Sequence, residues 1–144
     1  MKVEATKLEQ EFEAPEPVLA LVRYAAAQLG ANEELADEAA RTGVFQLQSR
    51  NVSVVLSPDE EHLILSTPLD EEWATQPARR QHALRASPSL LLQTGVAFCI
   101  TLAGPALMCR WSLDEAEADL LSAWIREFAL MADMIGAGTA AVAN

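Results

Sequence analysis

The residues that most often carry catalysis or bind metals are few in this chain and far apart. The two histidines, His62 and His82, each lack a second ligand three or four residues further on, the spacing that joins two metal ligands on a helix face. The two cysteines, Cys99 and Cys109, lie in apolar stretches, where a free thiol packs as a small hydrophobic residue. A cysteine nucleophile would also need a base within hydrogen-bonding reach.

Acidic side chains, glycines and tryptophans add no reactive arrangement. The carboxylates form two clusters that we interpret as solvated charge: Glu33, Glu34, Asp37 and Glu38, and then Asp59, Glu60 and Glu61. The six glycines form no phosphate-binding loop. Trp111 and Trp124 lie on apolar stripes and are predicted in the core or an interface, whereas Trp73 is expected to be exposed. We therefore expect no catalytic residue, no metal and no cofactor, and a protein that is not an enzyme.

The composition describes one small acidic domain. The chain has 144 residues, of which 51% are hydrophobic and 22% charged, enough apolar residues for a single core. Its net charge of -11 argues against nucleic acid and against an anionic membrane as partners. No apolar run approaches the ~20 residues of a membrane span, and the charged N-terminal residues differ from a secretory signal. We therefore expect a cytoplasmic protein with reduced thiols.

The first half of the chain predicts a helix and three strands. Apolar residues at helical spacing indicate a helix at 17–29, whose stripe covers part of a sheet. Residues 32–40 fit either a short helical turn or an acidic loop. Strands are predicted at 44–47, 52–56 and 62–66. Their short connections require an antiparallel meander.

The second half predicts further helices around a hairpin. Residues 78–86 have a helical pattern, and Ser87-Pro88 indicates the start of a separate short helix that ends near Gly95. Strands at 96–102 and 106–112 follow.

A final amphipathic helix is predicted at 113–135. The fold class is therefore α+β, in the order helix, three antiparallel strands, helix, two strands, helix, with helices packed on one twisted antiparallel sheet. The predicted organisation is a flexible acidic arm at 1–16, a single domain at 17–135 and a loose tail at 136–144.

Three consecutive leucines give the short helix more apolar surface than one face can bury. Leu90, Leu91 and Leu92 point about 100° apart on a helix. Either the helix is fully buried, or it pairs with a second copy in a two-fold dimer. We predict a dimer interface at these leucines and at Phe98 on the next strand.

A second apolar patch is predicted where the first helix meets the first two strands. It comprises Leu19, Val22, Val44, Leu47, Val54 and Val55. Val54 and Val55 point to opposite faces of their strand, so one apolar side chain is left outside the core. An exposed patch of this kind favours a binding site. The alternative is that the N-terminal arm covers it through Leu8 and Phe12.

The order of elements and the C-terminal half resemble the class I type III secretion chaperones, the Tir chaperone family. The resemblance lies in Leu90-Leu91 on a short helix before a strand, in the two hairpin strands, and in Leu113-Asp114-Glu115 leading into an amphipathic helix with Phe128. It implies a cytoplasmic bacterial homodimer with a role in virulence. Such a dimer binds the extended N-terminal chaperone-binding segment of a secreted effector and keeps it soluble and export-competent.

The same resemblance implies how the effector segment is held. Its apolar side chains enter shallow patches, formed here by the six predicted residues, and it can add a strand to a sheet edge. Contacts with components of the secretion apparatus are left open. The alternative function is a dimeric non-catalytic α+β adaptor that binds a folded partner protein. A chaperone binds a short unstructured peptide, whereas an adaptor requires the folded partner.

Overall fold

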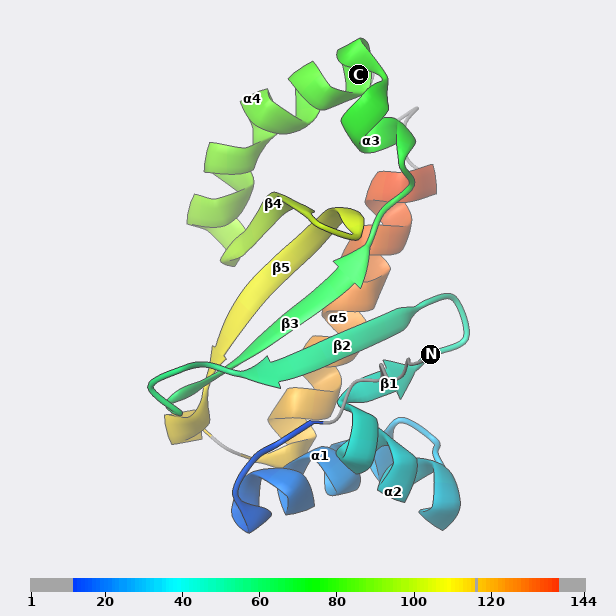
Figure 1. The fold of residues 1–144 in the computed structure, drawn as a ribbon, viewed down its shortest axis with the longest axis vertical. Coiled ribbons are helices and arrows are strands. Elements are labelled where there is room, and N and C mark those ends of the chain that lie inside the picture. Colours follow the sequence, from blue (N-terminus) through cyan, green and yellow to red (C-terminus); the bar gives the residue numbers. More distant parts are fainter. Residues whose placement is uncertain (1–11, 116, 138–144) are drawn as a thin grey trace, which may run out of the picture.

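The computed structural model describes residues 12–115 and 117–137, and it has the α+β fold that the sequence predicts (Figure 1). The strands are β1 (Val44–Gln46), β2 (Asn51–Leu56), β3 (His62–Pro68), β4 (Val96–Thr101) and β5 (Gly104–Ser112). The helices are α1 (Glu16–Gln28), α2 (Glu33–Thr42), α3 (Glu72–Thr75), α4 (Pro77–Thr94) and α5 (Ala118–Ala137). Residues 1–11 and 138–144, which hold most of the predicted arm and tail, lie outside the described residues.

The five strands form one antiparallel sheet in the order β1-β2-β3-β5-β4. The meander of β1, β2 and β3 is confirmed, and its strands begin and end within two residues of the predicted bounds. The β4–β5 hairpin joins this meander through β5, which pairs with β3 and places Cys109 beside Leu65. Within the described residues, β4 pairs with β5 alone, so it forms the second edge of the sheet.

Helix α5 crosses one face of the sheet, and the core lies between them (Figure 1). Buried side chains of the sheet and of α5 form this core: Leu63, Leu65, Leu107, Leu121, Ile125 and Phe128. Side chains alternate along each strand. On the opposite face, Val55 is exposed while Ile64 and Met108 are half-buried.

Helix α1 does not cover the sheet as predicted. It packs between α2 and α5 at one end of the molecule (Figure 1) and buries Val22, Ala25 and Ala26 there. Its C-terminal end is fixed to α5, because Arg126 Nη2 donates to the Gln28 carbonyl oxygen at 3.0 Å. The predicted stripe is therefore real, but it packs mainly against helices, and only its C-terminal part, at Leu29, lies near β1.

The ambiguous segment after α1 is a helix, α2. Asn32 begins it, because its side-chain oxygen accepts a hydrogen bond from the Leu35 N–H at 2.8 Å. Gly43 ends it with a φ of 74°, a left-handed conformation that favours glycine. A Cβ atom at Gly43 would lie 2.7 Å from the Val54 carbonyl oxygen. The close approach of α2 to β2 therefore depends on this glycine.

The predicted helix start at Ser87-Pro88 is wrong. One continuous helix, α4, runs from Pro77 to Thr94 with Pro88 inside it. Pro88 has no N–H to donate to the Leu84 carbonyl group. Leu84 is exposed, so water can hydrate that carbonyl group and the helix continues.

The expectation that Trp73 is exposed is also wrong, because it is buried in α3. Its ring centroid lies 5.5 Å from that of Phe98, and the Arg79 guanidinium carbon lies 5.5 Å from the indole ring. A polar sequence context gave no signal of these long-range contacts.

A short 3₁₀ turn at Leu113–Glu115 separates β5 from α5, so the last helix begins later than predicted. None of the helices among the described residues combines the length and apolar character needed to cross a membrane.

Candidate functional site

The outer edge of β1 presents unpaired backbone groups. The Val54 N–H donates to the Gly43 carbonyl oxygen at 2.7 Å, and the Leu47 N–H donates to the Arg50 carbonyl oxygen at 3.0 Å. Hydrogen bonding alternates along an antiparallel strand, so the backbone groups of Val44 and Gln46 point away from β2. The Val44 N–H donates to Thr42 Oγ1 at 3.3 Å, which leaves the Gln46 N–H and the carbonyl groups of Val44 and Gln46 open at this edge. Within the described residues, no strand pairs with this edge.

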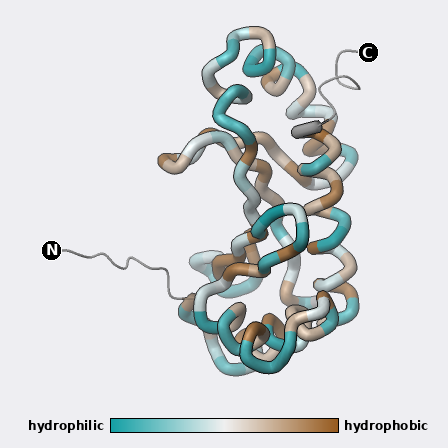
Figure 2. The backbone as a smooth tube through the Cα atoms, turned by 90° about the vertical axis from the view of Figure 1, so that its right-hand side faces the viewer, coloured by the Kyte–Doolittle hydropathy of each residue, from teal (hydrophilic) through white to brown (hydrophobic). Residues whose placement is uncertain are grey.

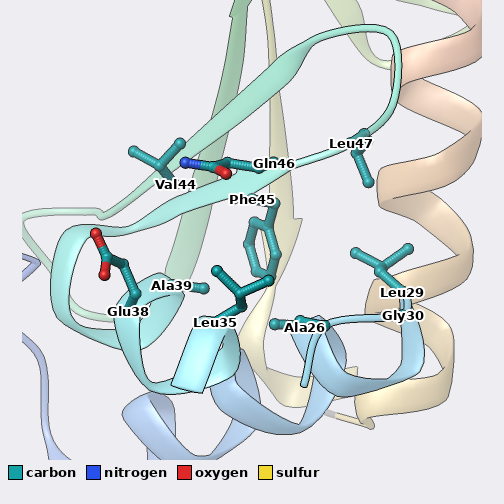
Figure 3. Close-up of a pocket in the computed structure, with 11 residues that line it drawn as sticks. Ala26, Leu29, Gly30, Leu35, Glu38, Ala39, Val44, Phe45, Gln46 and Leu47 are labelled. Atoms are coloured by element: carbon teal, nitrogen blue, oxygen red, sulfur yellow. The ribbon is translucent and has the colours of Figure 1, made fainter. Parts of the chain in front are cut away.

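A cavity of about 160 Å³ lies directly beside this edge. Figure 3 shows Phe45 at its centre, pointing toward Leu35 and the small side chains of Ala26 and Ala39. The remaining lining residues are Leu29, Gly30, Ala31, Glu38, Val44, Gln46 and Leu47. By volume alone, about 150 Å³ is enough space for a benzene molecule. This cavity can therefore take one apolar side chain.

The structure brings two of the six predicted patch residues to this site. Val44 and Leu47 line the cavity, and Leu19 is half-buried against the core. Val22 and Val54 are buried, so they support the surface from below and present none of it. Val55 is 51% exposed on the opposite face of β2 from Val54. The six residues therefore do not form one continuous surface.

Sequence reasoning missed the side chains that form the floor and wall of the cavity. Phe45 is buried between the sheet and the two N-terminal helices. Leu35 is 51% exposed and comes from the segment that the sequence left ambiguous. Its position among four carboxylates was the available signal, because a large apolar side chain on an otherwise charged helix indicates a face that contacts other apolar residues.

A second cavity, of about 190 Å³, lies behind α2 at the outer side of β2. Phe12 and Glu13 form one wall, and Ser53, Val54, Val55 and Leu56 form the other. Thr42 and Gly43 close it at the end of α2. Val55 therefore borders a groove that the N-terminal segment helps to build.

The predicted interface residues divide into an inner and an outer pair. Leu90 and Phe98 are half-buried against the core, whereas Leu91 and Leu92 are 50% and 86% exposed. Further large apolar side chains are exposed on α4 and at the β4–β5 hairpin: Leu84, Ile100 and Leu102. Figure 2 shows this hairpin projecting from the body with a hydrophobic tip. The helix is therefore not the fully buried one that we considered.

The two cysteines lie in different surroundings. Burial raises the pKa of Cys109 to about 11, although a hydrogen bond from Trp124 Nε1, at 3.3 Å, works to lower it. Burial also raises the pKa of Cys99. Cys99 pairs in register with Ala106 and Cys109 with Val96, so the two thiols point to opposite faces of the sheet. Neither environment favours a reactive thiolate at neutral pH.

The turn between β2 and β3 gathers one imidazole and two carboxylates. Ligand atoms of Asp59, Glu61 and His62 lie within 4.8 Å of one another. Hydrogen bonds from the Ser57 hydroxyl and the Glu61 N–H lower the pKa of Asp59. These bonds already satisfy part of the carboxylate, and both acidic residues are exposed. The cluster was missed because Asp59 lies three residues before His62 and not after it.

The chain matches none of the protein-family models and none of the curated proteins with which it was compared. We therefore infer function from the structure itself, and the β1 edge and its cavity are the features that indicate peptide binding.

Proposed function

We propose that this chain is a non-catalytic binding protein that captures an extended segment of a partner at the β1 edge, in the manner of a class I type III secretion chaperone. The observation that supports this function is the open backbone edge of β1 beside a cavity of about 160 Å³ that Leu35, Phe45 and Leu47 help to line. Backbone hydrogen bonds give affinity to any extended peptide, and a side-chain pocket gives selectivity. In this function, the captured segment belongs to a secreted effector in the bacterial cytoplasm.

The captured segment adds a sixth strand next to β1. The Gln46 N–H donates to the segment, and the carbonyl groups of Val44 and Gln46 accept from it. Alternate side chains of the segment point to opposite faces of the sheet. Those on the side of Phe45 face the cavity, where one apolar side chain loses its contact with water. The chaperone thereby hides apolar sequence that would otherwise aggregate.

Charge selects which segments arrive at this edge. Helix α2 carries Glu33, Glu34, Asp37 and Glu38, of which Glu38 lines the cavity, and the whole chain has a net charge of -11. An acidic surface attracts a basic segment and speeds their encounter, and added salt weakens this attraction. A basic segment with apolar residues at alternate positions is therefore the preferred ligand.

The proposed assembly is a two-fold homodimer formed through α4 and β4. Leu84, Leu91 and Leu92 are exposed on α4, and Ile100 is exposed on β4. A second copy would cover these side chains with the same surface, as a two-fold interface requires. Each dimer would then carry two β1 edges.

A substitution at the β1 edge tests the capture of a segment. Fluorescent peptides that tile the N-terminal regions of secreted proteins encoded beside this gene serve as probes. Gln46→Pro removes the outward N–H without removing a bond to β2, and Gln46→Ala is the matched control. We expect roughly tenfold weaker peptide binding for Gln46→Pro than for Gln46→Ala, which removes the same cavity-lining side chain but keeps the N–H. Equal binding by both variants would exclude strand addition at this edge.

The second candidate function is an adaptor that binds a folded partner. The exposed apolar side chains of Leu84, Leu92 and Leu102 favour it, because exposed apolar surface of this kind marks a protein interface. In this case, no peptide binds, and only the intact partner protein forms a complex. Leu84→Asp would then abolish the complex while Gln46→Pro leaves it intact.

A further inference from the structure

Phe12 inserts into the body of the protein before the first helix begins. Its side chain is 9% exposed and lies in the core cluster. Its backbone N–H donates to the Arg41 carbonyl oxygen, at the end of α2, at 2.9 Å. The space for its ring exists because Gly43 has no side chain, since a Cβ atom there would lie 3.1 Å from the Phe12 Cβ.

The ring of Phe12 does not fill the groove that receives it. A volume of about 190 Å³ remains between Phe12 and the β2 residues Ser53 to Leu56. Val55, which is 51% exposed, is among the residues that line this volume. The groove therefore has room for a larger or differently placed side chain next to the one already there.

The segment that carries Phe12 has few attachments. Residues 12–15 belong to no helix or strand. Among the described residues, the bond from the Phe12 N–H to Arg41 is the backbone hydrogen bond that joins this segment to α2. A segment held by the side chains of Phe12 and Ala14 and by one such bond can leave without unfolding the sheet.

We propose that the groove between Gly43 and β2 is a binding site for an aromatic side chain, and that Phe12 is its resident ligand. An aromatic residue of an extended partner segment takes the place of Phe12. Its side chain packs in the groove as Phe12 does, and its backbone N–H donates to the Arg41 carbonyl oxygen. Gly43 directly precedes β1, so the groove and the β1 edge are neighbours along the chain. The partner's use of the groove rests on the proposed function, whereas its occupation by Phe12 does not.

Phe12 competes with any such partner from within the chain. A tethered side chain has an effective concentration in the millimolar range for a short linker. The partner must therefore bind the groove and the edge at once, or carry a better aromatic anchor. This competition would make the protein discriminate against weakly binding peptides.

A peptide copied from the chain tests the groove without knowledge of the partner. The probe is a fluorescent peptide of residues 5–18, and the control peptide carries Phe12→Ala. The full-length Phe12→Ala protein should bind the probe at least about tenfold more tightly than the wild type, whose groove is filled. The control peptide should bind neither protein. Val55→Asp added to Phe12→Ala should weaken binding of the probe.

Equal binding of the probe by both proteins, or no binding by a folded Phe12→Ala protein, would overturn the proposal. Should that variant not fold, hydrogen exchange of the wild type decides. The Phe12 amide should exchange faster than the Leu65 amide of β3, because the segment opens locally. Equal protection of the two amides would overturn the site. Since the probe comes from this chain, its binding is independent of the outcome with Gln46→Pro.

Discussion

Arg50 ties the β1–β2 hairpin to two other parts of the molecule. Its Nε donates to Asp133 Oδ1 of α5 at 2.7 Å, and its Nη1 donates to the Pro68 carbonyl oxygen at 3.0 Å. The Ser49 hydroxyl donates to the other Asp133 oxygen at 2.7 Å. Burial works to raise the pKa of Asp133, but these hydrogen bonds and the Arg50 charge outweigh it and lower the pKa. One carboxylate thus holds the hairpin that carries the candidate site.

Asp133→Asn should lower the free energy of unfolding at neutral pH by about 1–3 kcal/mol, because Arg50 loses its charged partner. A carboxyl group whose pKa is lower in the folded protein contributes stability above its unfolded pKa. That contribution is lost as the pH falls through the folded pKa. Urea unfolding from neutral pH to about pH 3 should therefore show the wild-type advantage disappearing. Asp114→Asn, at an exposed position, is the control and should change nothing. An advantage that persists at low pH would contradict this role for the charge.

At the residue scale, the sequence predicted only part of the cavity beside β1. Val44 and Leu47 were found because β-branched and apolar residues in a short strand stand out. Phe45 lies between them in the same strand and was not assigned, because alternation shows that two faces exist but not which one a helix covers. The burial of Trp73 depends on Phe98, which is distant in sequence, and no local pattern reports such a contact.

Among the elements, α4 departs most from its sequence pattern. Pro88 lies in its interior, and Ala83 is its one buried residue among those described. Local signals predicted two helices, because serine followed by proline is frequent at helix starts. The two interpretations differ in what Ser87 does: it begins a helix in one, and in the other it is an ordinary helical residue.

Two alanine substitutions distinguish a continuous α4 from two helices. Pro88→Ala should stabilise the protein, by up to about 3 kcal/mol, because it restores a helical hydrogen bond and a favourable residue. Ser87→Ala should be neutral, whereas loss of an N-cap serine would cost ~1 kcal/mol. Thermal unfolding followed by circular dichroism measures both. Destabilisation by Ser87→Ala together with no effect of Pro88→Ala would restore the two-helix interpretation.

Some strand pairs of the sheet could be predicted from the sequence, and one could not. The meander of β1, β2 and β3 followed from connection lengths, which leave neighbouring strands no other arrangement. The position of β5 beside β3 did not, because α3, α4 and β4 separate them along the chain. Pairing across such a distance is decided by the burial of Leu65 and Leu107 under α5, and a single sequence does not contain that choice.

For the whole molecule, the grouping of exposed apolar side chains on α4 and the β4–β5 hairpin is the main feature (Figure 1). This group consists of Leu84, Leu91, Leu92, Ile100 and Leu102. Further exposed large apolar side chains are distributed over α1, α2, β2 and α5: Tyr24, Leu35, Val55, Leu120, Leu130 and Met134. Soluble monomers rarely expose large contiguous apolar patches, so the α4 group favours a second copy at this end, and Leu35 beside the cavity favours a peptide at the β1 end.

Charge placed on the outer side of α4 should separate the proposed dimer without unfolding the protomer. Leu92 is 86% exposed, so Leu92→Asp should give a folded monomer by light scattering. Leu90→Asp should instead lower the melting temperature, because Leu90 packs against the core. Leu120→Asp on α5, where Leu120 is 51% exposed, is the control and should change neither property. Soluble dimers from both Leu91→Asp and Leu92→Asp would place the interface elsewhere.

The brevity of β1 has a kinetic consequence for anything bound to it. The strand has three residues, so an added segment forms only a few backbone bonds before β1 ends at the turn around Ser49. With so few bonds, a complex dissociates in a single step, and most differences in affinity appear as differences in dissociation rate. The residence time of a captured segment is then set by the side chain in the cavity. In the proposed function, handover to the next binding partner would be spontaneous and would need no nucleotide hydrolysis.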